Sequence, residues 1–192
     1  RVDLVRRPLA VVGVVAEVSD QMRLAGRGFA FSFMGLHRAT LGRAAEDQDG
    51  ILRVDHEAHP DQTPPASLTR ELEREYRAVV DEILELRGDD GRIRAFVRSI
   101  TDAGALADTA GYSPDFNFDQ KVQLLETFDV VERLKLALQL QRDRLAELQH
   151  RRESLAAQVT QQQGLLAQLG TERAAIDWTP VEEALQRQLT LR

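Results

Sequence analysis

The chain of 192 residues contains no cysteine, which excludes a disulfide framework, thiolate metal sites and cysteine-protease chemistry. A reducing compartment suits such a chain, and we expect it in the cytoplasm. No apolar run approaches the length of a membrane span and no signal peptide is present, so we expect no membrane partner. The net charge of −6 disfavours nucleic acid as the main partner. Because the chain opens with Arg1 rather than Met and has no leader, we expect a piece of a larger protein.

Catalytic motifs are also missing. No G-x-x-x-x-G-K-[ST] occurs, so we expect no ATP hydrolysis by a phosphate-binding loop. Only two of the 25 cationic residues are lysines, Lys121 and Lys135, and both fall on amphipathic stretches at positions that indicate solvation. A Ser–Lys dyad needs a desolvated lysine. We therefore predict no catalytic residue and no cofactor.

One cluster, Asp55 to Asp61, has the composition of a metal site. Its spacing is H-E-x-H, from His56 to His59, and lacks the helical i,i+4 geometry of zinc proteases. On a strand, His56 and Glu57 point to opposite faces. An exposed strand end is favoured and we predict no metal ligands, with a metal-dependent enzyme kept only as a third hypothesis.

The first 62 residues predict a small β subdomain. Residues 9–18 are short and rich in β-branched side chains, and residues 19–28 contain two glycines typical of a hairpin connection. Phe29, Phe31 and Phe33 then alternate with smaller residues up to Gly35, which predicts a strand with one buried face. With extended segments at 36–41 and 51–58, we expect three or four antiparallel strands and the three phenylalanines in the core.

Helices follow a Pro-rich linker at residues 63–67. The patterns predict a bundle of short helices over residues 68–128: one over 68–87 that the glycines 88 and 91 end, two over 92–100 and 102–110, and one capped by Asn117 with Gln120. The fold class expected is α+β.

A long helix is predicted over residues 129–169, beginning at an Asp129 cap with Glu132 at the third helical position. A seam with alternating four- and three-residue spacing includes Leu134, Leu138, Leu145, Leu148, Leu155, Val159, Leu166 and Leu169. Gln141, Arg152 and Gln162 interrupt it, which favours a helical hairpin or a partly solvated, projecting arm over a tight coiled coil. Gly170 should end this helix, and residues 170–192 should form a hairpin return or a connector, with a last helix from Thr179-Pro180.

Two separated stretches resemble a known family. The first is Val12-Gly13-Val14-Val15-Ala16-Glu17-Val18 followed by Met34-Gly35-Leu36-His37-Arg38-Ala39, similar to V-G-T-V-A-x-I and E-G-L-x-R-A. The second is Leu106-Ala107-Asp108, then Lys121, then Leu124 to Leu134, similar to L-A-D … K-x-x-L-L-E-x-x-D-V-x-E-R-L. Over roughly residues 9–150 the chain therefore resembles the amino-terminal, substrate-binding domain of Lon and Lon-like proteases. The family's opening strands, with L-P-L-R-x-x-V-x-F-P-G, are absent before Arg1, so a fragment of that domain is expected.

The resemblance implies a non-catalytic domain that helps to capture unfolded or damaged polypeptides. In the family this domain precedes the ATPase and Ser–Lys peptidase domains of the same polypeptide, and the protease is a hexamer. The alternative is an architectural or oligomerisation arm of a divergent Lon-like protease, possibly independent of ATP, that does not contact substrate.

Candidate contact residues are apolar groups that a fold can leave exposed. For substrate they are Met22 and Leu24 in the predicted hairpin, and Tyr112, Phe116 and Phe118 in a loop between helices, each of which can instead fill the core. For helix packing or a subunit contact they are Leu155, Val159, Leu166 and Leu169.

Overall fold

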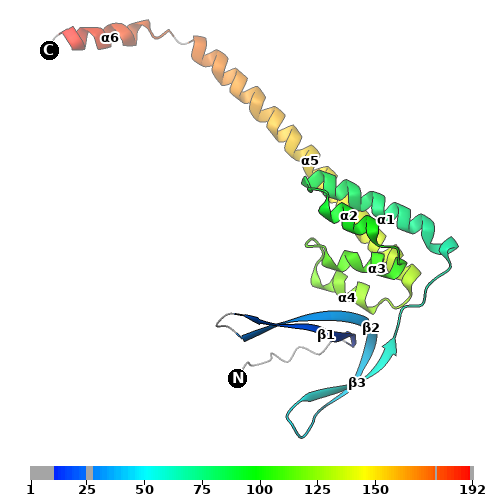
Figure 1. Cartoon of the computed structure of the whole chain (residues 1–192). Helices are drawn as coiled ribbons and strands as arrows, with labels where there is room; N and C mark the ends of the chain where they lie inside the picture. The colour runs from blue at the N-terminus through cyan, green and yellow to red at the C-terminus, as the bar shows by residue number, and fades with distance from the viewer. Residues whose placement is uncertain (1–10, 25–27, 176, 191–192) are drawn as a thin grey trace. The chain divides into compact units, whose positions relative to one another are not determined.

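A computed structural model describes residues 11–24, 28–175 and 177–190, which form two compact units, residues 1–145 and 146–192. The first unit holds an antiparallel sheet followed by helices, and this confirms the α+β prediction (Figure 1). The second holds the distal part of the longest helix and a last helix.

The sheet has three strands in the order β1 (Val12–Leu24), β2 (Gly28–Glu46) and β3 (Leu52–His59). The predicted hairpin connection over residues 19–28 is too long, because β1 continues to Leu24 and β2 begins at Gly28. The predicted strand end at Gly35 is also wrong. Ala16 pairs with Gly35 and Val15 with His37, so Leu36 is the extra residue of a β-bulge that lets one long strand pass through this position.

The helices of the first unit are α1 (Ala66–Arg87), α2 (Arg92–Ser99), α3 (Ala103–Asp108), the 3₁₀ turn η1 (Thr109–Tyr112), α4 (Phe118–Glu126) and the start of α5 (Val130–Ala175). The sequence signals act where expected. Gly88 ends α1 at φ 70°, a left-handed conformation that glycine adopts without strain. Asn117 and Gln120 form the predicted capping box of α4. Asp129 accepts from the Glu132 N–H at 2.9 Å, while the Glu132 carboxylate pairs with Lys135.

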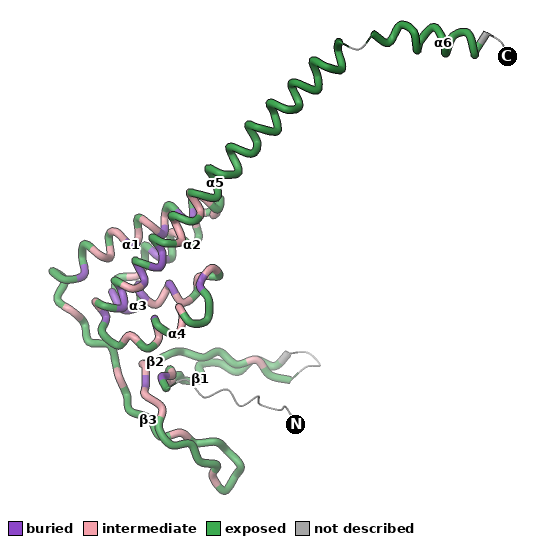
Figure 2. Tube along the Cα trace, turned by 180° about the vertical axis from the view of Figure 1, so that it is seen from behind, coloured by how far each residue is buried: buried purple, intermediate pink, exposed green. Residues whose placement is uncertain are grey.

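The hydrophobic core lies among these helices (Figure 2). Tyr76 of α1, Leu106 of α3 and Leu134 of α5 are fully buried and form its centre. The Tyr76 hydroxyl shares a hydrogen bond of 2.8 Å with Thr109 Oγ1. Burial raises the pKa of Tyr76, because the phenolate would lose its hydration.

The three alternating phenylalanines of β2 do not join this core. Phe29, Phe31 and Phe33 are 56%, 49% and 69% exposed, so the prediction that they are core residues is wrong. Alternation identifies one apolar face of a strand, but burial of that face requires a second layer to cover it.

The second unit contains residues 146–175 of α5 and the helix α6 (Thr179–Thr190). Its side chains from Arg151 onward are exposed wherever the structure describes them (Figure 2). Helix α5 does not end at Gly170 as predicted, since it runs on to Ala175. A single glycine costs a helix only about 1 kcal/mol relative to alanine, and good helix formers follow it. None of the described helices is long and apolar enough to cross a membrane.

Candidate functional site

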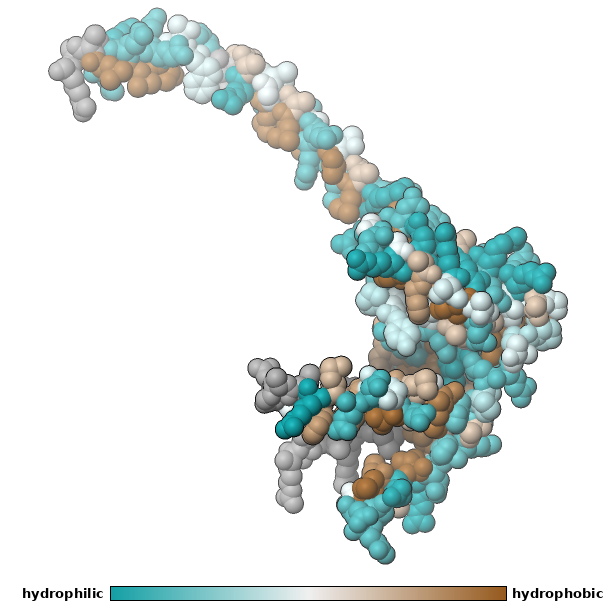
Figure 3. All heavy atoms as spheres, viewed as in Figure 1, coloured by the Kyte–Doolittle hydropathy of each residue, from teal (hydrophilic) through white to brown (hydrophobic). Residues whose placement is uncertain are grey.

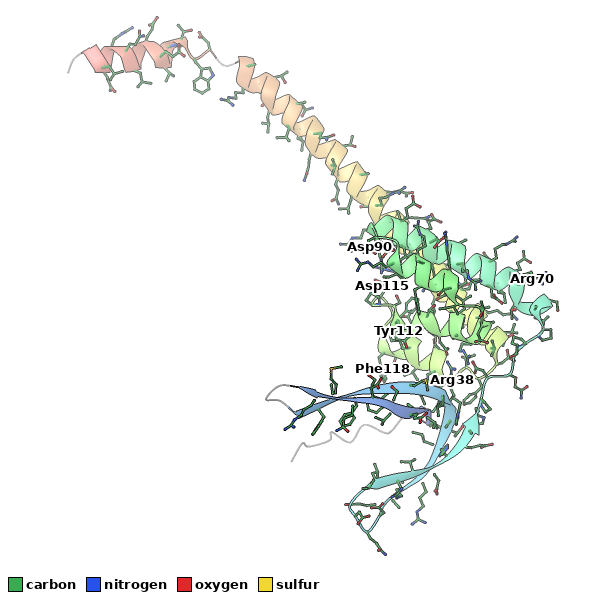
Figure 4. The ribbon with its side chains drawn as sticks, viewed as in Figure 1. Arg38, Arg70, Asp90, Tyr112, Asp115 and Phe118 are labelled. Atoms are coloured by element: carbon green, nitrogen blue, oxygen red, sulfur yellow. The ribbon has the colours of Figure 1, made fainter. Side chains whose placement is uncertain are left out.

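A cleft of about 680 Å³ lies in the first unit between the β1–β2 hairpin and the helical bundle. Strand residues line one side and residues of the helical region the other: Val14, Gly35, Leu36, His37 and Arg38 from the strands, Asp61 from the segment between β3 and α1, and Asp102, Ala105, Asp108, Gly111, Tyr112, Lys121, Leu124 and Leu125 from the helices and the cap of α3. In Figure 4, Arg38 marks the sheet side, and Tyr112 and Phe118 mark the helical side.

Arg38 joins the sheet to the helices at one end of the cleft. Its Nη2 lies 2.6 Å from Asp108 Oδ1 in α3, and its Nε donates to the Leu125 carbonyl at 3.0 Å, near the end of α4. Its Nη1 lies 3.6 Å from Asp61 Oδ1. The side chain is only 10% exposed, so these charge-assisted contacts replace its hydration.

Arg133 of α5 lies behind Arg38 and is fully buried. Its Nη2 pairs with Asp61, and its Nη1 donates to the Thr127 carbonyl at 3.1 Å. Its Nε lies 3.1 Å from Asp108 Oδ1 without hydrogen-bond alignment. Two arginines and two aspartates thus form one network, which we call the interlobe clamp: Arg38, Asp61, Asp108 and Arg133.

Gly104 of α3 makes room for the clamp. A Cβ atom there would overlap Asp61 Oδ2 and lie 3.0 Å from Arg133 Nη2. The two stretches that carry the family resemblance meet in this network, since Arg38 belongs to the first and Asp108 and Arg133 to the second. Sequence analysis identified the stretches but not their contact. Asp61 belongs to neither, and the sequence marked it only as the last residue of the cluster with the composition of a metal site, not as a partner of arginine.

The predicted substrate-contact residues occupy different surroundings. Tyr112 is 86% exposed and lines the cleft, and Phe118 is 71% exposed at the first position of α4. Phe116, by contrast, is buried in the helical core, which is the alternative that the sequence analysis gave for these residues. It is therefore not available as a surface contact. Met22 is 65% exposed on β1, where it pairs with Ala30. Leu24 ends β1, and its side chain lies outside the described part of the chain.

Strand pairing assigns the apolar residues of the hairpin to its two faces. Opposed residues of antiparallel strands share a face, and the pairs Ala16–Gly35 and Val18–Phe33 place Phe33 on the same face of the hairpin as Ala16 and Val18. Phe31 and Phe29 follow by alternation, with ring centroids 6.4 Å apart. Met22 falls on the opposite face. The hairpin therefore exposes apolar side chains on both of its faces, and Figure 3 shows apolar groups on this hairpin.

The two histidines of the H-E-x-H cluster have different surroundings. His56 is exposed on β3, whereas His59 shares a hydrogen bond of 2.7 Å with Thr40 Oγ1 and stacks on Phe128 with ring centroids 4.3 Å apart. His59 and Phe128 line a smaller cleft of about 380 Å³. Within the described residues, no group of three or more His, Asp or Glu side chains is arranged to hold a metal ion.

The candidate helix-packing residues all lie on the distal part of α5. Leu155, Val159, Leu166 and Leu169 are 50–68% exposed. Trp178, Val181, Leu185 and Leu189, at and within α6, are also at least half exposed. The second unit thus presents two apolar helix faces.

Comparison with known proteins gives consistent results. The sequence model of the ATP-dependent protease La (LON) substrate-binding domain matches residues 5–142. The chain is 42% identical over 139 residues to a Lon protease of Chloroflexus aurantiacus and 39% identical over 136 residues to one of Salinispora arenicola. These matches cover 72% and 71% of this chain but only 17% of each relative. Among solved structures, the N-terminal domain of Mycobacterium avium complex Lon protease is similar, with a TM-score of 0.60 and 34% identity, over 69% of this chain and 70% of that one.

Proposed function

Because the chain belongs to the family of Lon substrate-binding domains, we propose that it recognises unfolded or damaged polypeptides for a Lon-type protease. The relatives are Lon proteases, and the chain spans 17% of their length. We propose that the chain itself carries no catalytic group and that ATPase and Ser–Lys peptidase domains of the same cytoplasmic polypeptide act on the captured substrate.

The observation that carries this proposal is the exposed apolar surface at the cleft. Tyr112 is largely exposed on the helical side, and Leu36 and Val14 are about half exposed on the strand side. Phe118, three residues before the lining residue Lys121 on α4, is also largely exposed. Unfolded chains expose the apolar side chains that folded proteins bury, and such surfaces bind them without requiring a defined sequence. The binding energy of one such patch is small, so hexameric assembly would raise the avidity by presenting several copies to one substrate chain.

The test is binding of a fluorescent, permanently unfolded polypeptide, with the folded form of the same protein as the control ligand. We expect the unfolded form to bind preferentially, and Tyr112→Ser with Leu36→Ser, two exposed residues of the cleft lining, to weaken this binding. Phe96→Ser is the matched control, because Phe96 is 58% exposed on α2 and does not line the cleft. Met22→Ser tests the other face of the hairpin.

Equal binding of folded and unfolded ligands would contradict the recognition role. If Phe96→Ser weakened binding as much as the double variant, the contact surface would not be the cleft. The mass of the protein is recorded alongside, so that avidity in an oligomer is separated from affinity of one chain.

The second candidate function is architectural and rests on the apolar seam of distal α5. Leu155, Val159, Leu166 and Leu169 follow coiled-coil spacing and are exposed in the single chain. In this alternative, residues 129–192 hold copies of the protease together or space them, and make no substrate contact. Sedimentation should then show concentration-dependent association that Leu155→Asp with Leu166→Asp abolishes. A monomer at all concentrations would argue against it.

A further inference from the structure

Lys121 of α4 differs from the other charged residues of the cleft. It is half-buried and lines the cleft, and its side chain makes no ion pair or hydrogen bond with any part of the chain that the structure describes. Arg38, the other cation of the lining, is already engaged by Asp108 and by the Leu125 carbonyl. A lysine that lines a cleft and has no ion-pair partner there can donate to an anion brought by a ligand.

The acidic residues of the lining are engaged elsewhere. Asp61 and Asp108 are neutralised by the two arginines of the interlobe clamp. Asp102 caps α3 by accepting from the Ala105 N–H at 2.7 Å. Lys121 is therefore the cation of the described cleft lining that is available to pair with an anionic group of a ligand.

The lining that contains Lys121 also contains apolar side chains. Leu124 and Leu125 from the same helix, Leu36 from β2 and the largely exposed Tyr112 line the cleft with Lys121. A ligand that uses both features carries a negative charge beside apolar side chains.

We propose that this cleft binds an apolar peptide segment bearing a carboxylate, with the Lys121 ammonium group donating to that carboxylate. The inference rests on the proposed function, since it specifies the chemistry of the polypeptide captured there. The carboxylate has two possible sources, the C-terminus of the polypeptide or an Asp or Glu side chain, and both present the same group to Lys121.

The chain supplies its own matched control. Lys135 is its other lysine, lies on α5 outside the cleft lining, and pairs with Glu132 at 2.8 Å. Lys121→Gln removes the charge at the cleft and keeps a polar side chain, Lys121→Arg keeps the charge, and Lys135→Gln removes a charge elsewhere.

The experiment measures fluorescence anisotropy of three short Leu- and Phe-rich peptides with the 192-residue chain and these variants. The first peptide ends in a free carboxylate, the second is its C-terminal amide, and the third is the amide with one internal Glu. We expect the free acid to bind about two- to fivefold more tightly than the amide, the range for a partly exposed ion pair. The preference should vanish in Lys121→Gln and persist in Lys121→Arg and Lys135→Gln. Circular dichroism confirms that each variant is folded.

The third peptide identifies the source. Binding equal to the free acid supports recognition of any carboxylate, and binding equal to the plain amide supports recognition of the C-terminus. Equal binding of all three peptides, weakened by Tyr112→Ser, overturns the role of Lys121 and leaves the proposed function standing. A preference that survives Lys121→Gln also overturns it. Binding by none of the peptides overturns both proposals.

Discussion

Replacing Arg133 with methionine is expected to destabilise the first unit by about 3–5 kcal/mol, the cost of removing one partner from a buried ion pair. Methionine fills much of the same volume, so the change tests charge rather than packing. The Arg133 side chain is fully buried and contacts Asp61, Asp108 and the Thr127 carbonyl. Its loss leaves two carboxylates with only Arg38 between them, at 3.6 Å and 2.6 Å.

The matched control is Arg142→Met on the same helix. Arg142 pairs with Glu75, but the two side chains are 47% and 39% exposed. A pair this exposed is screened by water and contributes about 0–1 kcal/mol. The two substitutions remove the same group from the same helix, and they differ in burial.

Urea denaturation followed by far-UV circular dichroism measures both losses. Trp178 is the single tryptophan and belongs to the second unit, so its fluorescence serves as an internal reference that should not follow unfolding of the first. A loss for Arg133→Met no larger than for Arg142→Met would refute the reasoning. It would mean that the cost of desolvating Arg133 in the folded protein already cancels what its partners provide.

Three further predictions follow from other parts of the structure. Gly104→Ala should lower the unfolding free energy by about 2 kcal/mol or more in the same urea assay, because its Cβ would overlap Asp61, whereas Gly111→Ala, with no atom within 4 Å, should change it by less than about 0.5 kcal/mol. Burial raises the pKa of Tyr76, so the stability that Tyr76 contributes is complete below the unfolded pKa of about 10 and falls above it, where only the unfolded chain ionises. Tyr76→Phe should therefore remove, from the plot of unfolding free energy against pH above pH 10, a slope of up to about 1.4 kcal/mol per pH unit. An unchanged slope would contradict the assignment. Gly170→Ala should raise the helicity of distal α5 and increase the opening free energy of its backbone amides, measured by hydrogen exchange, by about 0.5–1 kcal/mol. No added protection would contradict a continuous helix there.

Local interactions explain what could be predicted for the fold. The Asn117–Gln120 capping box, the Asp129 cap and the left-handed Gly88 depend on groups within a few residues of one another. Such interactions have nearly the same energy in any fold, so their sequence signals are reliable. Gly170 shows the limit of the same reasoning, because the residues after it are good enough helix formers to carry the helix past one glycine.

The candidate site could be predicted only in part. Tyr112 was identified as an apolar residue in a loop, and it lies at the cleft. Phe116, four residues later, carries the same signal and is buried, because its position in the fold and not its type decides which layer it meets. Lys121 was correctly placed on a helix, but its position in the cleft lining could not be predicted, because β1 and β2 supply the opposite side of the cleft.

The sequence by itself determined the helices, their caps, an antiparallel sheet of three or four strands and the family to which the chain belongs, since these follow from short-range periodicity and from ordered motifs. Only the tertiary structure brought Arg38, Asp61, Asp108 and Arg133 into one buried network across as many as 95 residues of chain. It also left Phe29, Phe31 and Phe33 exposed. The physical reason is common to both. A pattern along the chain specifies which side chains share a face, but whether that face meets an opposite charge, a second layer or water depends on residues distant in sequence.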